Sequence, residues 1–317
     1  MMKEKKLILK DQRILLLFVI FAIIACVTVI NPKFITIKNI VTILGQISVI
    51  GVLTMAMSML LISGGIDLSL GNIMALSSVV MAALLAKGQN IFIVIFGGII
   101  IGLVCGLLNG FIIAKSKCIP LIITLGTSQI FYGLSLTISK GRIMSFSGVF
   151  DVLSKTKFFG VFPAMLTVLI LMIILAYILM NKTIVGKRLM AIGGNEKNAY
   201  LCGIEIDKYK ILIYSLSGIF CSVAAIVFSA RIDSVTANAG LGYETSALTA
   251  AIIGGVTFEG GKGSIAGAFL GCILMGVISN AMNILQVETY IQTIITGVII
   301  AAAVVFSNVA SMKGKKC

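Results

Sequence analysis

The chain has 317 residues, 59% of them hydrophobic and 11% charged, and its mean hydropathy is +1.15. A water-soluble domain carries about 25% charged residues, so this composition excludes a soluble globular protein and indicates one embedded in a membrane. The net charge of +14 does not indicate nucleic acid binding, because no basic patch is interleaved with aromatic residues.

The hydrophobic pattern predicts an all-α polytopic membrane protein that forms a single domain, residues 1–317. The first apolar stretch, after MMKEKK, is interpreted as a span rather than a secretory signal, because no Ala-x-Ala cleavage site closes it. About ten transmembrane segments are expected, although 245–257 is too short to cross a bilayer as a straight helix. They lie at about 14–31, 40–62, 68–86, 91–114, 120–138, 161–180, 211–230, 245–257, 264–285 and 289–308.

Basic residues predict the orientation of these segments. If the chain starts in the cytoplasm, most of its 25 lysine and arginine residues fall in cytoplasmic segments, as the positive-inside rule requires. Both termini are therefore expected in the cytoplasm.

A glycine-rich stretch, ISGGIDLSLG (62–71), is predicted to interrupt a helix. Gly64 and Gly65 can end one helix, and Asp67 or Ser69 can cap the next. An acidic side chain near membrane depth is costly, which makes Asp67 a candidate for function. The alternative interpretation is a plain helix cap at the membrane interface.

A second stretch, TANAGLGYETSA (236–247), has the same character and carries Glu244. Its YETSALTA resembles GNIMALSS after the first break, and an odd number of segments separates the two. The chain is therefore predicted to contain an inverted repeat of units at about 40–140 and 211–308 with paired broken helices. Chance similarity between helices of similar composition is the alternative.

The long segment 181–210 mixes both charge signs and is predicted to be a cytoplasmic loop. Within it, Asn195 can cap a short helix that ends at Gly203, and Glu196 favours the first turn. Such a helix is suited to dock into a groove of a partner, whereas the alternative is an ordinary connection. The candidate contact residues are Gly193, Gly194, Asn195, Glu196, Ala199, Gly203 and Ile204.

The segment GGVTFEGGKGS (254–264) looks like a phosphate-binding loop but departs from its pattern. That loop needs Gly, four residues, then Gly-Lys and a hydroxyl residue. Val256 stands where the first glycine is required, and Gly263 stands where the hydroxyl is required. No nucleotide is expected there.

The sequence lacks the residues that metal binding and hydrolytic catalysis usually require. The chain has no histidine, and its seven cysteines form no Cys-x-x-Cys pair, so neither a metal site nor hydrolytic catalysis is expected. The predicted interior is polar but uncharged, which suits a neutral, hydroxyl-rich solute. The candidates for a translocation path or a helix break are Gly64, Gly65, Asp67, Ser69, Asn109, Thr124, Gln129, Glu244 and Asn280.

Six segments, in order across nearly the whole chain, resemble the permease subunit of bacterial ABC importers for ribose and related monosaccharides. They are NPKFITIKNI (31–40), SGGIDLSLG (63–71), GKRLMAIGGNEKNAYLCGI (186–204), YSLSGI (214–219), NAGLGYE (238–244) and GGVTFEGGKGSIAGAFLG (254–271). The match is loose where Lys197 and Asn198 follow Glu196, and it is poor over 139–160.

The resemblance implies a homodimeric pore in the bacterial cell (inner) membrane for a ribose-like monosaccharide. It also implies a cytoplasmic ATPase, contacted by the segment around Glu196, that binds ATP and Mg²⁺, and an extracytoplasmic sugar-binding protein. The permease would be no enzyme and would hold no cofactor. Arg142 and Arg231 are predicted to meet acidic groups of the binding protein, or else simply to flank their spans. The alternative function is an ion-coupled secondary transporter of a small neutral solute, with Asp67 and Glu244 as ion ligands.

Overall fold

A helix occupies most of each predicted apolar segment in the computed structural model, which describes residues 12–158 and 162–314. Seven helices of this described part, α2, α3, α5, α6, α8, α11 and α13, are long and apolar enough to cross a membrane, and α4 and α14 contain shorter apolar stretches. The all-α polytopic prediction is confirmed. The elements are α2 (Gln12–Ile30), η1 (Pro32–Ile35), α3 (Ile37–Ile62), α4 (Leu70–Ala86), α5 (Ile91–Ser116), α6 (Pro120–Ser139), β1 (Met144–Ser145), α7 (Asp151–Lys155), β2 (Lys157–Phe158), β3 (Phe162–Pro163), α8 (Ala164–Lys182), α9 (Ile184–Gly194), α10 (Glu196–Leu201), α11 (Ile206–Ile232), β4 (Ser234–Val235), α12 (Tyr243–Ile253), α13 (Ile265–Ile284) and α14 (Thr289–Gly314).

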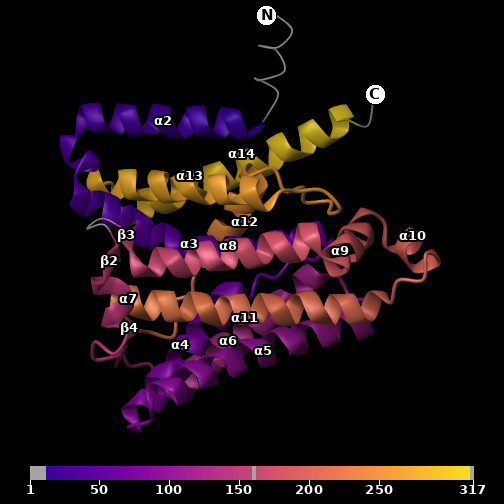
Figure 1. Ribbon diagram of the computed structural model, residues 1–317, viewed down its shortest axis with the longest axis horizontal. Coiled ribbons are helices and arrows are strands. Elements are labelled where there is room, and N and C mark those ends of the chain that lie inside the picture. Colours follow the sequence, from indigo (N-terminus) through magenta and orange to yellow (C-terminus); the bar gives the residue numbers. More distant parts are fainter. Residues whose placement is uncertain (1–11, 159–161, 315–317) are drawn as a thin grey trace, which may run out of the picture.

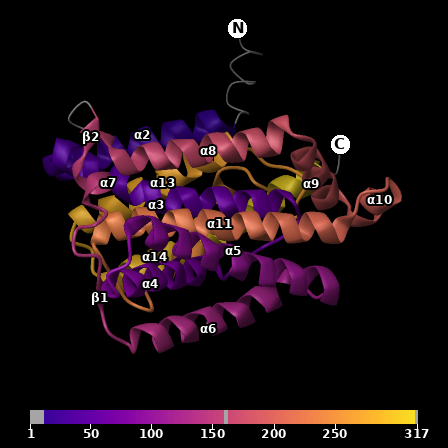
Figure 2. The ribbon, with the colours of Figure 1, turned by 60° about the horizontal axis from the view of Figure 1, so that its bottom comes forward.

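Helix α3 runs through the middle of the bundle (Figure 2). It packs against α8, α11, α12 and α13, and nearly every residue of its second half is buried. A helix that is apolar on all sides is typically buried among other helices. The central position of α3 therefore agrees with the absence of a polar face in its sequence.

Helices α5 and α11 make the most extensive contact between two helices of the described bundle. An added Cβ at Gly102 would strike the Gly218 carbonyl, and one at Gly106 would strike the Tyr214 carbonyl. Small residues let two membrane helices approach until their backbones touch. We call this contact the glycine seam; its members on α5 are Gly102, Gly106 and Gly110.

The two ends of the bundle differ. One end carries α9 and α10, and α2 begins and α14 ends there (Figure 1). The other end carries α7 and two short antiparallel ribbons, in which β1 pairs with β4 and β2 with β3. The lysines of 1–11 and 315–317, used above for orientation, lie outside the described residues, and the inverted repeat stays a prediction.

Candidate functional site

Residues next to helix α10 in the sequence cap both of its ends. The Asn195 side chain accepts a hydrogen bond from the Asn198 backbone N–H at 2.9 Å. At the other end Gly203 has φ of +79°, and the Ile204 N–H donates to the Ala199 carbonyl at 3.1 Å. This is the six-to-one bond of a Schellman motif. The predicted short helix therefore has the cap and the stop that the sequence indicated.

The outer face of α10 carries large apolar side chains. Tyr200 is 69% exposed and Leu201 is 74% exposed, whereas Ala199 is buried against the bundle. The helix projects beyond the ends of the spanning helices (Figure 1). Exposed apolar residues outside the lipid-facing surface are typical of a protein contact.

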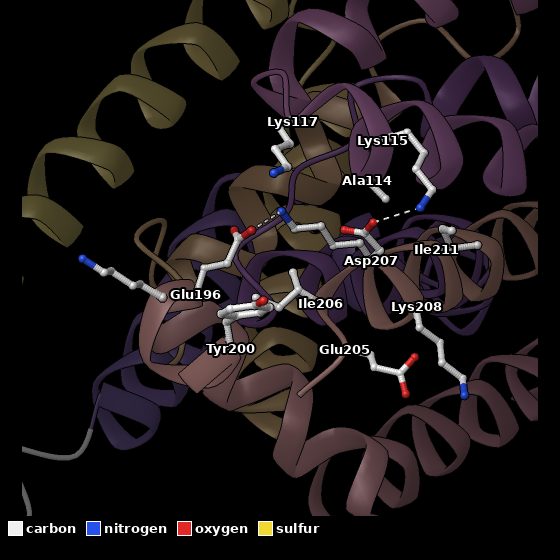
Figure 3. Close-up of a pocket in the computed structure, with 12 residues that line it drawn as sticks. Ala114, Lys115, Lys117, Glu196, Tyr200, Glu205, Ile206, Asp207, Lys208 and Ile211 are labelled. Atoms are coloured by element: carbon white, nitrogen blue, oxygen red, sulfur yellow. Dashed lines mark hydrogen bonds and ion pairs between the residues drawn. The ribbon is translucent and has the colours of Figure 1, made fainter. Parts of the chain in front are cut away.

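A cavity of about 1010 Å³ opens between α10, the end of α5 and the start of α11 (Figure 3). Lys210 Nζ lies 2.8 Å from Glu196 Oε1, and Lys115 Nζ lies 3.1 Å from Asp207 Oδ2. The first pair joins α10 to α11, and the second joins α5 to α11. Exposed pairs of this kind contribute about 0–1 kcal/mol each, so neither fixes the position of its helices by itself. The charged residues that line the cavity are Lys115, Lys117, Glu196, Lys197, Glu205, Asp207, Lys208 and Lys210.

The break between α3 and α4 is organised around the buried side chain of Asp67. Its Oδ1 accepts hydrogen bonds from the Ser69 N–H at 2.7 Å and from the Ser69 hydroxyl at 2.5 Å. Asn109 of α5 donates to Asp67 Oδ2 at 3.2 Å and to the Ser69 hydroxyl oxygen at 2.9 Å. Asp67 thus binds the start of α4, while Ser69 occupies the N-cap position without a side-chain cap bond of its own.

Neighbouring helices bind further backbone groups of this break. The Tyr214 hydroxyl donates to the Ile66 carbonyl at 2.8 Å and accepts from the Ile66 N–H at 3.2 Å. The Leu68 N–H donates to Thr124 Oγ1 of α6 at 3.1 Å. Irregular backbone at membrane depth persists only where protein or trapped water provides such partners.

The second break lies before α12 and touches the first. Gly242 has φ of +84°, and its N–H donates to Glu244 Oε1 at 3.2 Å. A Cβ added at Gly71, in the first turn of α4, would strike the Gly240 carbonyl. The starts of the two interrupted helices therefore pack directly on one another.

The remaining predicted site residues are dispersed. Asn280 is buried and exchanges amide hydrogen bonds of 2.9 and 3.1 Å with Asn39 of α3. Gln129 is exposed on α6. Arg142 is exposed and Arg231 is half-buried, both at the end of the bundle opposite α10. The structure thus brings Asp67, Ser69 and Asn109 together but not these four; the functional roles assigned to all of them stay predictions.

The sequence was compared with known protein families. Residues 39–304 match the family described as the branched-chain amino acid transport system / permease component. The chain is a permease of this family. The permease is 35% identical over 292 residues to the ribose import permease protein RbsC of Bacillus subtilis (strain 168), covering 91% of this chain and 90% of that one.

Two further relatives come from Escherichia coli (strain K12). The D-allose transport system permease protein AlsC is 35% identical over 297 residues, covering 93% of this chain and 91% of its own. The L-arabinose transport system permease protein AraH is 36% identical over 295 residues, covering 92% and 89%. No solved structure matches the permease.

Sequence reasoning missed some residues of this site. Tyr200 and Leu201 were overlooked although two adjacent apolar residues in a charged segment outside the spans are a recognisable signal. Tyr214 was overlooked because a tyrosine inside an apolar helix looks like ordinary core, and only the fold reveals that its hydroxyl reaches Ile66.

Proposed function

We propose that this permease is the membrane-spanning subunit of an ATP-driven ABC importer for a ribose-like monosaccharide. Family membership and relatives named for the transport of ribose, allose and arabinose support this. The uncharged polar residues of its interior suit a neutral solute. ATP and Mg²⁺ would bind to a separate cytoplasmic ATPase, and an extracytoplasmic binding protein would deliver the sugar.

The observation that carries the proposal is the capped helix α10 with its exposed Tyr200 and Leu201. A rigid, short helix with an apolar face fits a groove of a partner. We propose that this groove belongs to the ATPase. Gly193 and Gly194 would position the helix, Asn195, Glu196 and Ala199 would form it, and Gly203 and Ile204 would end it.

Transport by the purified complex tests the proposal. The permease, ATPase and binding protein are assembled in proteoliposomes with ATP enclosed, and labelled ribose, allose and arabinose are offered with the binding protein outside. We expect uptake only with enclosed ATP. Uptake that instead follows an imposed ion gradient without ATP would contradict the proposal.

A pair of substitutions at Gly203 tests the role of α10. Valine at this position would have to adopt a positive φ, which costs about 1–2 kcal/mol and disrupts the end of the helix. Asparagine tolerates the same conformation. We expect Gly203→Val to lose both ATPase co-purification and uptake while staying in the membrane, and Gly203→Asn to retain both. Normal uptake by the valine variant would exclude this role.

The ion-coupled alternative is not favoured. Its ion ligands would be Asp67 and Glu244, but both carboxylates accept hydrogen bonds from their own chain, as described above. Membership in a family of transport-system permease components further supports a multi-subunit importer.

A second copy of the permease is proposed to pack against α6. Gln129 is exposed on this helix, and Gly126 and Gly133 lie on the same face with open space where a Cβ would be. A polar side chain facing lipid is costly, so a partner surface is expected there. Oxidative cross-linking of Gln129→Cys should give a dimer, whereas Ile174→Cys on exposed α8 should not. Equal cross-linking at both positions would contradict this interface.

The end of the bundle that carries α10 is proposed to face the cytoplasm. Both termini would then be cytoplasmic, since α2 begins and α14 ends at this end (Figure 1). A reporter that fluoresces only in the cytoplasm, fused after the last residue, should be bright. A dark but expressed fusion would reverse the orientation.

The opposite end is proposed to receive the binding protein through Arg142 and Arg231. Arginine pairs well with carboxylates, and a basic surface steers an acidic partner. Arg142→Glu should raise the sugar concentration needed for half-maximal uptake, and a Glu→Arg change on the binding protein should restore it. If no such change restores uptake, the arginines only flank their spans.

A further inference from the structure

Three segments that are far apart in the sequence meet beside the start of α10. They are the end of α3 with the break that follows it, the end of α9, and the turn from α12 to α13. The Gly261 N–H donates to the Ile62 carbonyl at 2.9 Å, which ties the first and third segments together. We call the contact among Ile62, Gly64, Gly193, Gly260 and Gly261 the glycine junction.

At the glycine junction, backbone lies directly against backbone. A Cβ added at Gly193 would strike the Ile62 carbonyl oxygen and would lie 2.7 Å from the Gly261 nitrogen and 2.9 Å from the Gly64 nitrogen. One added at Gly260 would lie 2.7 Å from the Gly193 oxygen and 2.9 Å from the Gly64 Cα. These contacts contain no side chain that could rotate to absorb a displacement.

The segments that meet here lead to the elements that a transport cycle would move. Gly193 lies two residues before Asn195, which caps α10. Gly64 opens the break that contains Asp67, and Gly261 lies in the turn that joins α12 to α13. At the glycine junction, the end of α9 directly before α10 therefore touches the α3–α4 break and the α12–α13 turn.

We propose that Gly193 is a positioning residue that transmits a displacement of α10 to the α3–α4 break and to the α12–α13 turn. This inference rests on the coupling role proposed above for α10. When the ATPase moves α10, the backbone contacts of the junction shift the other two segments with it. Closely packed contacts rearrange between discrete states instead of deforming gradually, so a small movement of α10 changes the arrangement of the α3–α4 break and of the α12–α13 turn.

A matched pair of substitutions, Gly193→Ala and Gly297→Ala, tests this role. Gly297 lies within α14, away from the glycine junction, and a Cβ there meets nothing within 4 Å, so alanine fits without contact. The complete complex is assembled in proteoliposomes as above. Sugar uptake, ATP hydrolysis with and without sugar-loaded binding protein, and ATPase retention on the purified permease are measured for each variant.

For Gly193→Ala we expect ATPase retention and ATP hydrolysis within about twofold of the wild type but uptake lowered about tenfold or more, in the range of typical coupling energies. Gly297→Ala should match the wild type in every measurement. Uptake by Gly193→Ala within about twofold of the wild type would overturn the proposal. So would a parallel loss of retention, hydrolysis and uptake in a folded protein, because a purely structural role predicts that pattern.

A second variant removes hydrogen bonds beside the junction without enlarging a side chain that contacts it. The Thr257 hydroxyl donates to the Gly260 carbonyl at 3.1 Å and to the Lys262 carbonyl at 2.9 Å, which shapes the turn. Thr257→Val removes these bonds at nearly constant volume, so it tests the proposal even if alanine at position 193 prevents folding. We expect the ATP hydrolysed per sugar imported to rise about threefold or more.

An unchanged ratio of ATP hydrolysed to sugar imported in Thr257→Val would contradict the transmission role. Failure of the proposed function itself would appear differently, as an absence of ATP-dependent uptake by the wild-type complex.

Discussion

Glycine brings backbones together in both the glycine seam and the glycine junction, but the two regions are built differently. In the seam, the glycines lie inside α5 and face α11 over much of its length. In the junction, they lie at helix ends and in a turn, and Gly64, Gly260 and Gly261 have positive φ values between +71° and +85°. Helices held along a whole face move as one unit, whereas helix ends that meet at one point can pivot. We therefore expect the helices of the seam to move together, and we propose that a displacement of α10 reaches them through the junction.

The largest effect is expected from overfilling the seam. In Gly102→Leu the new side chain would collide with the Gly218 carbonyl and the Ser222 hydroxyl. Overpacking costs about 1–3 kcal/mol and more where backbone must move, so we expect little folded protein after purification. Gly297→Leu on α14, where a Cβ meets nothing within 4 Å, is the control. A Gly102→Leu protein with an unchanged Tm would show that the seam is not rigid.

The next largest effect is expected at Asp67, between the two regions. Asp67→Leu leaves the Ser69 and Asn109 donors without their buried acceptor, at about 1–3 kcal/mol for each unsatisfied group. Asp67→Asn keeps one acceptor oxygen for Ser69. We therefore expect no uptake from the leucine variant and partial uptake from the asparagine variant. Equal uptake by both would remove any special role of the carboxylate.

A smaller effect, on uptake more than on stability, is expected at Tyr214. The carbonyl of Tyr214 lies in the seam, and its hydroxyl binds the α3–α4 break. Tyr214→Phe keeps the packing but leaves the Ile66 N–H and carbonyl without their partner. The cost is about 1–3 kcal/mol, localised in the break. We expect uptake to fall while the Tm changes by only a few degrees, as measured by thermal unfolding with and without the ATPase. A lowered Tm with normal uptake would indicate that the hydroxyl serves stability alone.

The smallest effect is expected from the ion pairs around the cavity. Lys210→Met removes the bond to Glu196 but keeps an apolar stem of similar length. A partly exposed pair contributes about 0–1 kcal/mol, so stability should hardly change and uptake should fall less than twofold. Lys115→Met, which breaks the pair with Asp207, is the parallel variant. A complete loss of uptake in either would place the cavity, not the junction, at the centre of coupling.

Local features could be predicted from the sequence. The spans follow from apolar length alone, and α10 follows from a cap residue and a stop residue that act within a few positions. Asn195 and Gly203 do in the structure what their residue types indicate. Glycine at every fourth position of α5 likewise carries its own periodic signal, although only the fold identifies α11 as the partner.

Contacts between distant segments could not be predicted. Nothing in the sequence around Ile62, Gly193 or Gly261 indicates that the three meet, because each stretch alone is an ordinary helix end or turn. Asn280 illustrates the same limit. The sequence shows a polar residue within an apolar helix, but it does not show that the amide of this residue pairs with the amide of Asn39 on α3.

The start of α2 and the end of α14 lie at the same end of the bundle as α10 (Figure 1). A linker between two copies of the chain would therefore not have to cross the membrane, and a tandem single polypeptide becomes practical. In such a fusion one half can carry Gly193→Ala while the other stays unaltered. Uptake by this mixed molecule would reveal whether the two halves work independently or only in concert.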